Sequence, residues 1–157
     1  MEEENLEGLG GWLSLVGLSL VFSPPGIAVA NLVYYRDFFA NNTWSILTTP
    51  GTEASNYLLA TVIITQAVVN IVALLVSILL VVLFLWKKRM FPKVFIGSLV
   101  IASLYAIAVL WGIHFLAPDI PVLNYETIKN LGISILSAVV LVAYMILSKR
   151  VKETFIR

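Results

Sequence analysis

Four long apolar segments, whose interiors carry no charged side chain, dominate this sequence. They cover residues 9–35, 57–86, 94–116 and 128–147. Each is long enough to cross the hydrocarbon core of a bilayer, which takes roughly 20 helical residues. Only 12% of the chain is charged, against about a quarter of a soluble domain. We therefore predict an all-α integral membrane protein, in which residues 1–157 form a single transmembrane domain folded as a four-helix bundle.

The positive charges gather in two regions, and their position predicts which way the helices cross. Eight of the ten Lys and Arg residues lie in segments 87–93 and 148–157, and the other two are Arg36 and Lys129. With four crossings, the two basic segments lie on the same side of the membrane. Because cytoplasmic loops are enriched in Lys and Arg, we predict that both termini are cytoplasmic.

This orientation assigns the loops to the two faces of the membrane. It predicts outer loops at 36–56 and 117–127, a cytoplasmic loop at 87–93 and a cytoplasmic tail at 148–157. Cations near an anionic leaflet attract its headgroups. The residues that we expect to contact anionic lipid are Lys87, Lys88, Arg89, Lys93, Lys149, Arg150 and Lys152.

Pro24, Pro25 and Gly26 interrupt the first apolar segment. Proline lacks an N–H group and clashes with the preceding helical turn, so we predict that the first helix is kinked or broken there. A kink would pack against neighbouring helices, whereas a break would offer free carbonyl groups to a ligand or ion. The Ala-Val-Ala sequence at 28–30 also resembles a signal-peptidase site, although the acidic residues 1–7 are unlike the basic start of a signal peptide.

Three polar side chains share one face of the second apolar segment. Gln66, Asn70 and Ser77 are separated by four and seven positions, which places them on the same side of a helix. Buried amides in lipid usually form hydrogen bonds between helices. The alternative is that these side chains line a cavity for a ligand.

Small residues spaced three or four apart indicate where helices can approach closely in lipid. Such faces pack either against other helices of the same chain, which we expect, or against a second copy of the protein. The residues concerned are Gly10, Ser14, Gly17, Ala108, Gly112, Ser134 and Ala138.

The sequence holds few groups that perform chemistry. It has no cysteine and one histidine, His114, which we expect to be solvated or hydrogen-bonded at the membrane interface. Proton-driven transporters usually carry an Asp, Glu or Lys inside the membrane, and the interiors of the apolar segments here contain none of these residues. We therefore expect no catalytic residues, no metal site and no cofactor, and the net charge of +1 does not suggest nucleic-acid binding.

Several short sequences resemble a family of small bacterial inner-membrane proteins of unknown function. They are GGWL at 10–13 followed by Ser-Pro at 23–24, KRMFP at 88–92 and SKRVKETF at 148–155. The resemblance implies four helices in a bacterial cytoplasmic membrane, and it implies no activity. Members of the family often carry Glu in the second helix where this chain has Gln66, which implies the loss of a carboxylate.

Two functions remain open from the sequence. The first is a non-enzymatic accessory, assembly or envelope component that acts through contacts with another membrane protein. The second is a binder or passive conduit for a lipid or small hydrophobic ligand, at the Gln66 and Asn70 face and the broken first helix. Membrane lipids are expected partners, and the oligomeric state is left open.

We also expect Trp12 to meet the tail, near Arg150 or against Phe155.

Overall fold

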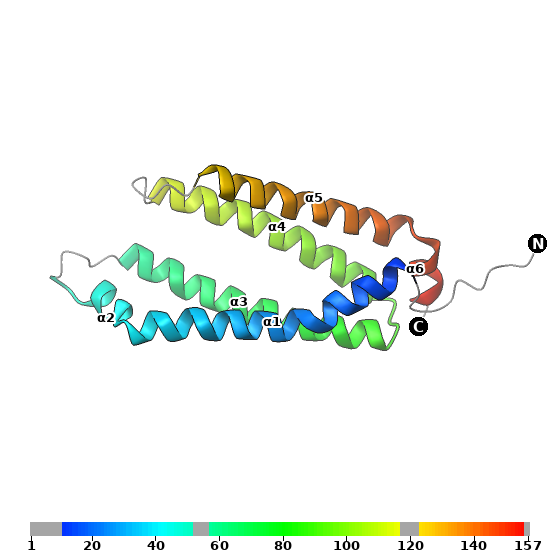
Figure 1. The fold of residues 1–157 in the computed structure, drawn as a ribbon, viewed down its shortest axis with the longest axis horizontal. Helices are drawn as coiled ribbons and strands as arrows, with labels where there is room; N and C mark the ends of the chain where they lie inside the picture. The colour runs from blue at the N-terminus through cyan, green and yellow to red at the C-terminus, as the bar shows by residue number, and fades with distance from the viewer. Residues whose placement is uncertain (1–10, 52–56, 117–122, 156–157) are drawn as a thin grey trace, which may run out of the picture. The chain divides into compact units, whose positions relative to one another are not determined.

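The computed structural model describes residues 11–51, 57–116 and 123–155, and this part of the chain is built from helices (Figure 1). Four of the helices are long and two have six residues. In chain order they are α1 (Trp12–Ala40), α2 (Thr43–Thr48), α3 (Tyr57–Leu85), α4 (Phe91–Leu116), α5 (Tyr125–Leu147) and α6 (Lys149–Thr154).

The four long helices confirm the predicted membrane-crossing segments. Each is long and apolar enough to cross a bilayer. Between 6% and 22% of the most apolar part of each helix is buried inside the protein, so most of the large apolar side chains point outward. An apolar surface of this extent is stable in lipid and not in water. The chain is therefore a multi-pass membrane protein.

The first helix differs from the prediction in two respects. Residues 24–26 do not break it, because α1 is continuous from Trp12 to Ala40 with Pro24 and Pro25 inside it. The kink that we predicted as the other possibility remains a prediction. The helix also continues five residues past the predicted end at Tyr35. It stops before Asn42, whose φ of 54° is a left-handed conformation that Asn tolerates better than most residues.

The loops in the structure are also shorter than the loops that we predicted from the sequence. The segment predicted as the outer loop 36–56 contains the end of α1 and all of α2. At the other face, α4 begins at Phe91 rather than at 94. Pro92 lies in the first turn of α4, where proline is favoured because its missing N–H has no helical partner in any case.

The chain divides into two compact units, one formed by residues 1–14 and 82–157 and the other by residues 15–81. In the first unit, α4 packs along α5 (Figure 1). The second unit contains most of α1 and α3, with α2 between them in the sequence. The prediction of a single domain remains a prediction.

A cluster of phenylalanine rings holds the tail in the first unit. The ring of Phe155 stacks on that of Phe91 at 4.6 Å between centroids and lies 5.9 Å from that of Phe84. All three side chains are buried, as is Leu13 of the same unit. The cluster therefore fixes the end of the chain against the α3–α4 turn.

The tail turns away from α5 to reach this cluster. Helix α5 ends at Leu147, and Ser148 caps a new helix by accepting a hydrogen bond from the Val151 N–H at 3.4 Å. The prediction that Trp12 meets the tail remains a prediction. Trp12 is 68% exposed, whereas the neighbouring Leu13 is fully buried.

The expected close packing of Gly112 is not found among the described residues. A Cβ atom added to Gly112 would meet nothing within 4 Å, and the same is true of Gly132. Ser134 is exposed and Ala138 is half-buried. Gly112 and Ser134 therefore do not mark a tight helix contact within the described chain, and the prediction for Ala138 remains a prediction.

Replacing Phe155 with Ala should release α6 from the α3–α4 turn, because truncating a buried Phe typically costs about 3–5 kcal/mol. Lys149 and Lys152 are exposed, so trypsin should then cleave after them faster in the detergent-solubilised protein, as followed by mass spectrometry. Glu153→Ala, at an exposed position of the same helix, is the control. Equal cleavage rates in the two variants would show that Phe155 does not hold the tail.

Candidate functional site

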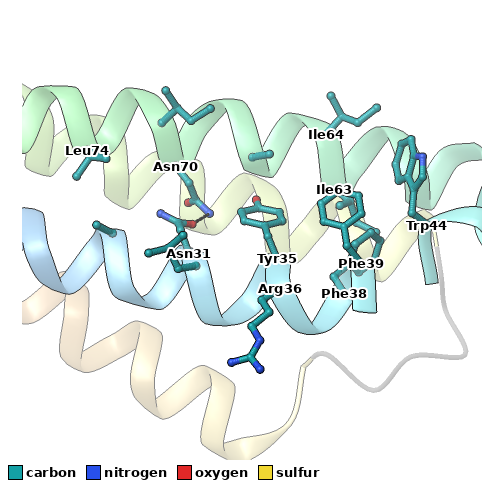
Figure 2. A pocket seen from close by; sticks show the side chains of 14 residues that line it. Asn31, Tyr35, Arg36, Phe38, Phe39, Trp44, Ile63, Ile64, Asn70 and Leu74 are labelled. Carbon is teal, nitrogen blue, oxygen red and sulfur yellow. Dashed lines mark hydrogen bonds between the residues drawn. The ribbon is translucent and has the colours of Figure 1, made fainter. Parts of the chain in front are cut away.

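A chain of three amide side chains joins α1 to α3 in the unit formed by residues 15–81. The Gln66 Nε2 donates a hydrogen bond to the Asn70 Oδ1 at 2.9 Å, and the Asn70 Nδ2 donates to the Asn31 Oδ1 at 2.7 Å. Figure 2 shows Asn31 and Asn70 facing each other across the two helices. All three residues are half-buried. Asn70 therefore reaches a partner on another helix, and Gln66 is linked to that helix through Asn70.

Ser77, the third residue of the predicted polar face, does not join this chain. Its side chain is buried, and the Oγ donates to the Leu74 carbonyl of the same helix at 2.7 Å. Asn31 is the functional residue that sequence reasoning missed. It is an isolated amide between Ala30 and Leu32 in an apolar segment, and that isolation is the signal that could have identified it.

A pocket of about 790 Å³ lies beside this amide chain, within the unit formed by residues 15–81. Its volume falls in the range of roughly 300–1,000 Å³ that is typical of small-molecule sites. The wall is almost entirely apolar, and Asn70 and Asn31 are its two amides (Figure 2). The lining residues are Ala28, Asn31, Leu32, Tyr35, Arg36, Phe38, Phe39, Trp44, Ile63, Ile64, Ala67, Asn70, Ile71 and Leu74.

One end of the pocket is aromatic. The ring of Phe38 lies 6.5 Å from that of Trp44 on α2 and stacks at 6.4 Å on that of Tyr34. Trp and Tyr are enriched where a membrane meets water. Tyr34 is exposed, whereas Tyr35 and Trp44 are half-buried and line the pocket. We therefore expect this end of the pocket to lie at an interface of the membrane.

Two residues with polar groups, Tyr35 and Arg36, lie at the aromatic end of the pocket. The Tyr35 hydroxyl oxygen is buried and makes no hydrogen bond within the described part of the chain. Arg36 is exposed and also lines the pocket. In Figure 2 the Arg36 side chain points away from α3, so it lies at the edge of the pocket.

The residues of the predicted helix break lie outside this pocket. Pro24, Pro25 and Gly26 are not among its lining residues, and a Cβ atom added to Gly26 would meet nothing within 4 Å. The proline segment therefore does not form the ligand site that a broken helix would offer.

The predicted lipid-contacting cations gather at one end of the other unit. The stacking of Phe91 on Phe155 brings the α3–α4 turn and the tail together. Arg150 is half-buried, and the others are exposed, namely Lys87, Lys88, Arg89, Lys93, Lys149 and Lys152. The two basic segments lie at the same end of this unit. This position agrees with the inference that both lie on the same side of the membrane.

His114 lies near the end of α4 and is exposed. Its ring is 6.4 Å from that of Trp111 and 5.8 Å from that of Phe115. No group of three His, Cys, Asp or Glu side chains that could hold a metal ion occurs among the described residues.

The amide chain gives a testable coupling between α1 and α3. In a double-mutant cycle, Asn31→Ala and Asn70→Ala should be coupled by about 0.6–1.7 kcal/mol, the size of interhelical hydrogen bonds in membrane proteins. The free energy of unfolding in detergent–SDS mixtures is the measurement. Asn31→Ala and Ser77→Ala form the control pair, whose effects should add within about 0.5 kcal/mol. Additive effects for the first pair would contradict the hydrogen bond.

Comparison with known proteins supplies a family but no function. Residues 6–156 match the family described as a protein of unknown function (DUF2569). No curated protein and no solved structure matches the chain. The match covers nearly the whole sequence and agrees with the four membrane helices, so this chain belongs to the DUF2569 family.

Proposed function

We propose that this protein is a non-enzymatic binder of a membrane lipid, which places one acyl chain in the pocket between α1, α2 and α3. The observation that carries this proposal is the pocket of about 790 Å³ that reaches Asn31 and Asn70 and has an almost entirely apolar wall. A closed interface between α1 and α3 would instead have favoured a role limited to contacts with another membrane protein. That accessory role remains a prediction.

An acyl chain suits this pocket because of the solvent that surrounds it. Helices α1 and α3, which line most of the pocket, are long enough to cross the membrane, so lipid chains are the most abundant apolar molecules beside it. A chain that moves from lipid into the pocket gains little from the hydrophobic effect, because both surroundings are apolar. Affinity must then come from close packing and from the few polar groups of the wall.

We propose further that both termini face the cytoplasm of a bacterium and that the protein lies in the cytoplasmic membrane. The distribution of Lys and Arg supports this orientation. In this orientation the aromatic end of the pocket faces the outer leaflet. The exposed cations of the α3–α4 turn and the tail would then contact anionic headgroups of the inner leaflet.

Reporters fused after Arg157 test this orientation. A fluorescent protein that folds only in the cytoplasm should be active there, and alkaline phosphatase, which requires an oxidising compartment, should be inactive. The matched control is the same pair of reporters fused after Thr49, which follows α2 and should give the opposite result. Phosphatase activity at the C-terminus would contradict the proposal.

Filling the pocket tests the binding function. Ala67 lines the pocket from α3, whereas Ala73 of the same helix is exposed and lies outside the lining. Native mass spectrometry of the protein released from detergent should detect one tightly retained lipid. Ala67→Trp should reduce its retention roughly tenfold, because overpacking typically costs 1–3 kcal/mol, and Ala73→Trp should not. Equal retention in both variants, or none in the unchanged protein, would contradict the proposal.

A further inference from the structure

We infer that the occupant is a phospholipid whose glycerol-ester carbonyl accepts a hydrogen bond from the Tyr35 hydroxyl, with its phosphate within reach of Arg36. The inference rests on the proposed function and specifies the chemistry of the ligand. It depends on three observations, namely the Tyr35 hydroxyl without a partner, the depth of this residue along α1, and the position of Arg36.

The Tyr35 hydroxyl is a donor that lacks an acceptor. Its oxygen is buried, lies in a residue that lines the pocket, and has no hydrogen-bond partner in the described chain. A buried polar group without a partner costs about 1–3 kcal/mol. Figure 2 shows the Tyr35 ring directed from α1 toward α3. A molecule in the pocket that offers a carbonyl oxygen would satisfy this hydroxyl, whereas a pure hydrocarbon would not.

The depth of Tyr35 matches that of the ester groups in a leaflet. Helix α1 ends at Ala40, five residues past Tyr35, which corresponds to about 7.5 Å along the helix axis. Tyr34 and Trp44 mark the membrane interface at this end. The headgroup and interfacial layer on each side of the hydrocarbon core is roughly 5–8 Å thick. Tyr35 therefore lies near the boundary where the ester carbonyls meet the acyl chains.

Arg36 supplies the charge that a phosphate would meet. It is the only Lys or Arg between residues 15 and 81, and it lies at the edge of the pocket with its side chain exposed. Guanidinium groups bind phosphate through paired hydrogen bonds and are more weakly hydrated than ammonium groups. A neutral apolar ligand could not form an ion pair with a cation at this position.

Deeper in the pocket, the wall changes from aromatic to aliphatic. Asn31 lies one helical turn below Tyr35, and its amide oxygen already accepts a hydrogen bond from Asn70. Beyond it, Ala28 on α1 and Leu74 on α3 line the inner end of the pocket. This order of headgroup, ester and chain along one helix fits a phospholipid that enters from the leaflet at the α2 end.

A comparison of two lipids isolates the proposed hydrogen bond. The probes are a diacyl phosphatidylglycerol and its dialkyl ether analogue, which lacks both carbonyl groups. The purified full-length protein in detergent should bind the ester lipid roughly three- to tenfold more tightly, the equivalent of one net hydrogen bond. Tyr35→Phe should abolish the preference while both lipids still bind. Tyr34→Phe, at an exposed neighbouring position, is the control and should keep it.

The phosphate contact is tested with diacylglycerol, which has the same chains and esters but no phosphate. The unchanged protein should bind phosphatidylglycerol more tightly than diacylglycerol, and Arg36→Gln should reduce this difference. If both lipid pairs bind without preference and Ala67→Trp still blocks them, the headgroup inference is wrong and the pocket function stands. If Ala67→Trp has no effect on any of these lipids, the proposed function itself fails.

Discussion

The hydrogen bond between Asn70 and Asn31 is the interaction on which the arrangement of α1 and α3 depends. In lipid, an amide without a partner is costly because the solvent offers neither donors nor acceptors. At 2.7 Å, this bond joins α1 to α3, and most of the pocket residues on the two helices are apolar. Interhelical bonds of this kind are worth about 0.6–2 kcal/mol. Their main effect is to select one rotation and one register of the two helices.

That register places the groups of the pocket. Because Asn31 and Tyr35 are four residues apart, they share one face of α1, and fixing Asn31 toward α3 also directs Tyr35 into the same space. Gln66 completes the arrangement by donating to Asn70 from one turn away on α3. The amide chain therefore fixes α1 relative to α3 at the level of Asn31 and Asn70. The pocket extends from there toward Trp44 and the interface.

Hydropathy was sufficient to predict the four membrane helices, because a chain in lipid must present long uncharged segments. It could not predict their ends, which depend on individual residues such as Asn42, with its left-handed backbone, and Pro92 in the first turn of α4. The double proline suggested a kink or a break, and α1 continues through it without a break. The rule that proline disrupts a helix applies to an isolated helix and does not include the contacts that the helix makes in the folded protein.

Part of the candidate site was visible in the sequence, and part required the structure. The spacing of Gln66 and Asn70 identified one polar face. Their partner Asn31 is 39 residues away from Asn70, and no single-sequence pattern pairs two such positions. The same holds for Tyr35 and Phe155, which the sequence presents as an interfacial aromatic and a residue of a basic tail. Their roles depend on what lies beside them in space.

The most direct test of the account is to map where a lipid chain lies on the protein. A phospholipid with a photoreactive diazirine midway along one acyl chain would be incorporated at low abundance into nanodiscs that hold the full-length protein. After illumination, peptide mass spectrometry locates the cross-links. The account predicts that they concentrate on pocket residues of α1 and α3, such as Leu32, Ile63 and Ile71. Cross-links spread evenly over the exposed apolar faces of all four long helices would contradict it.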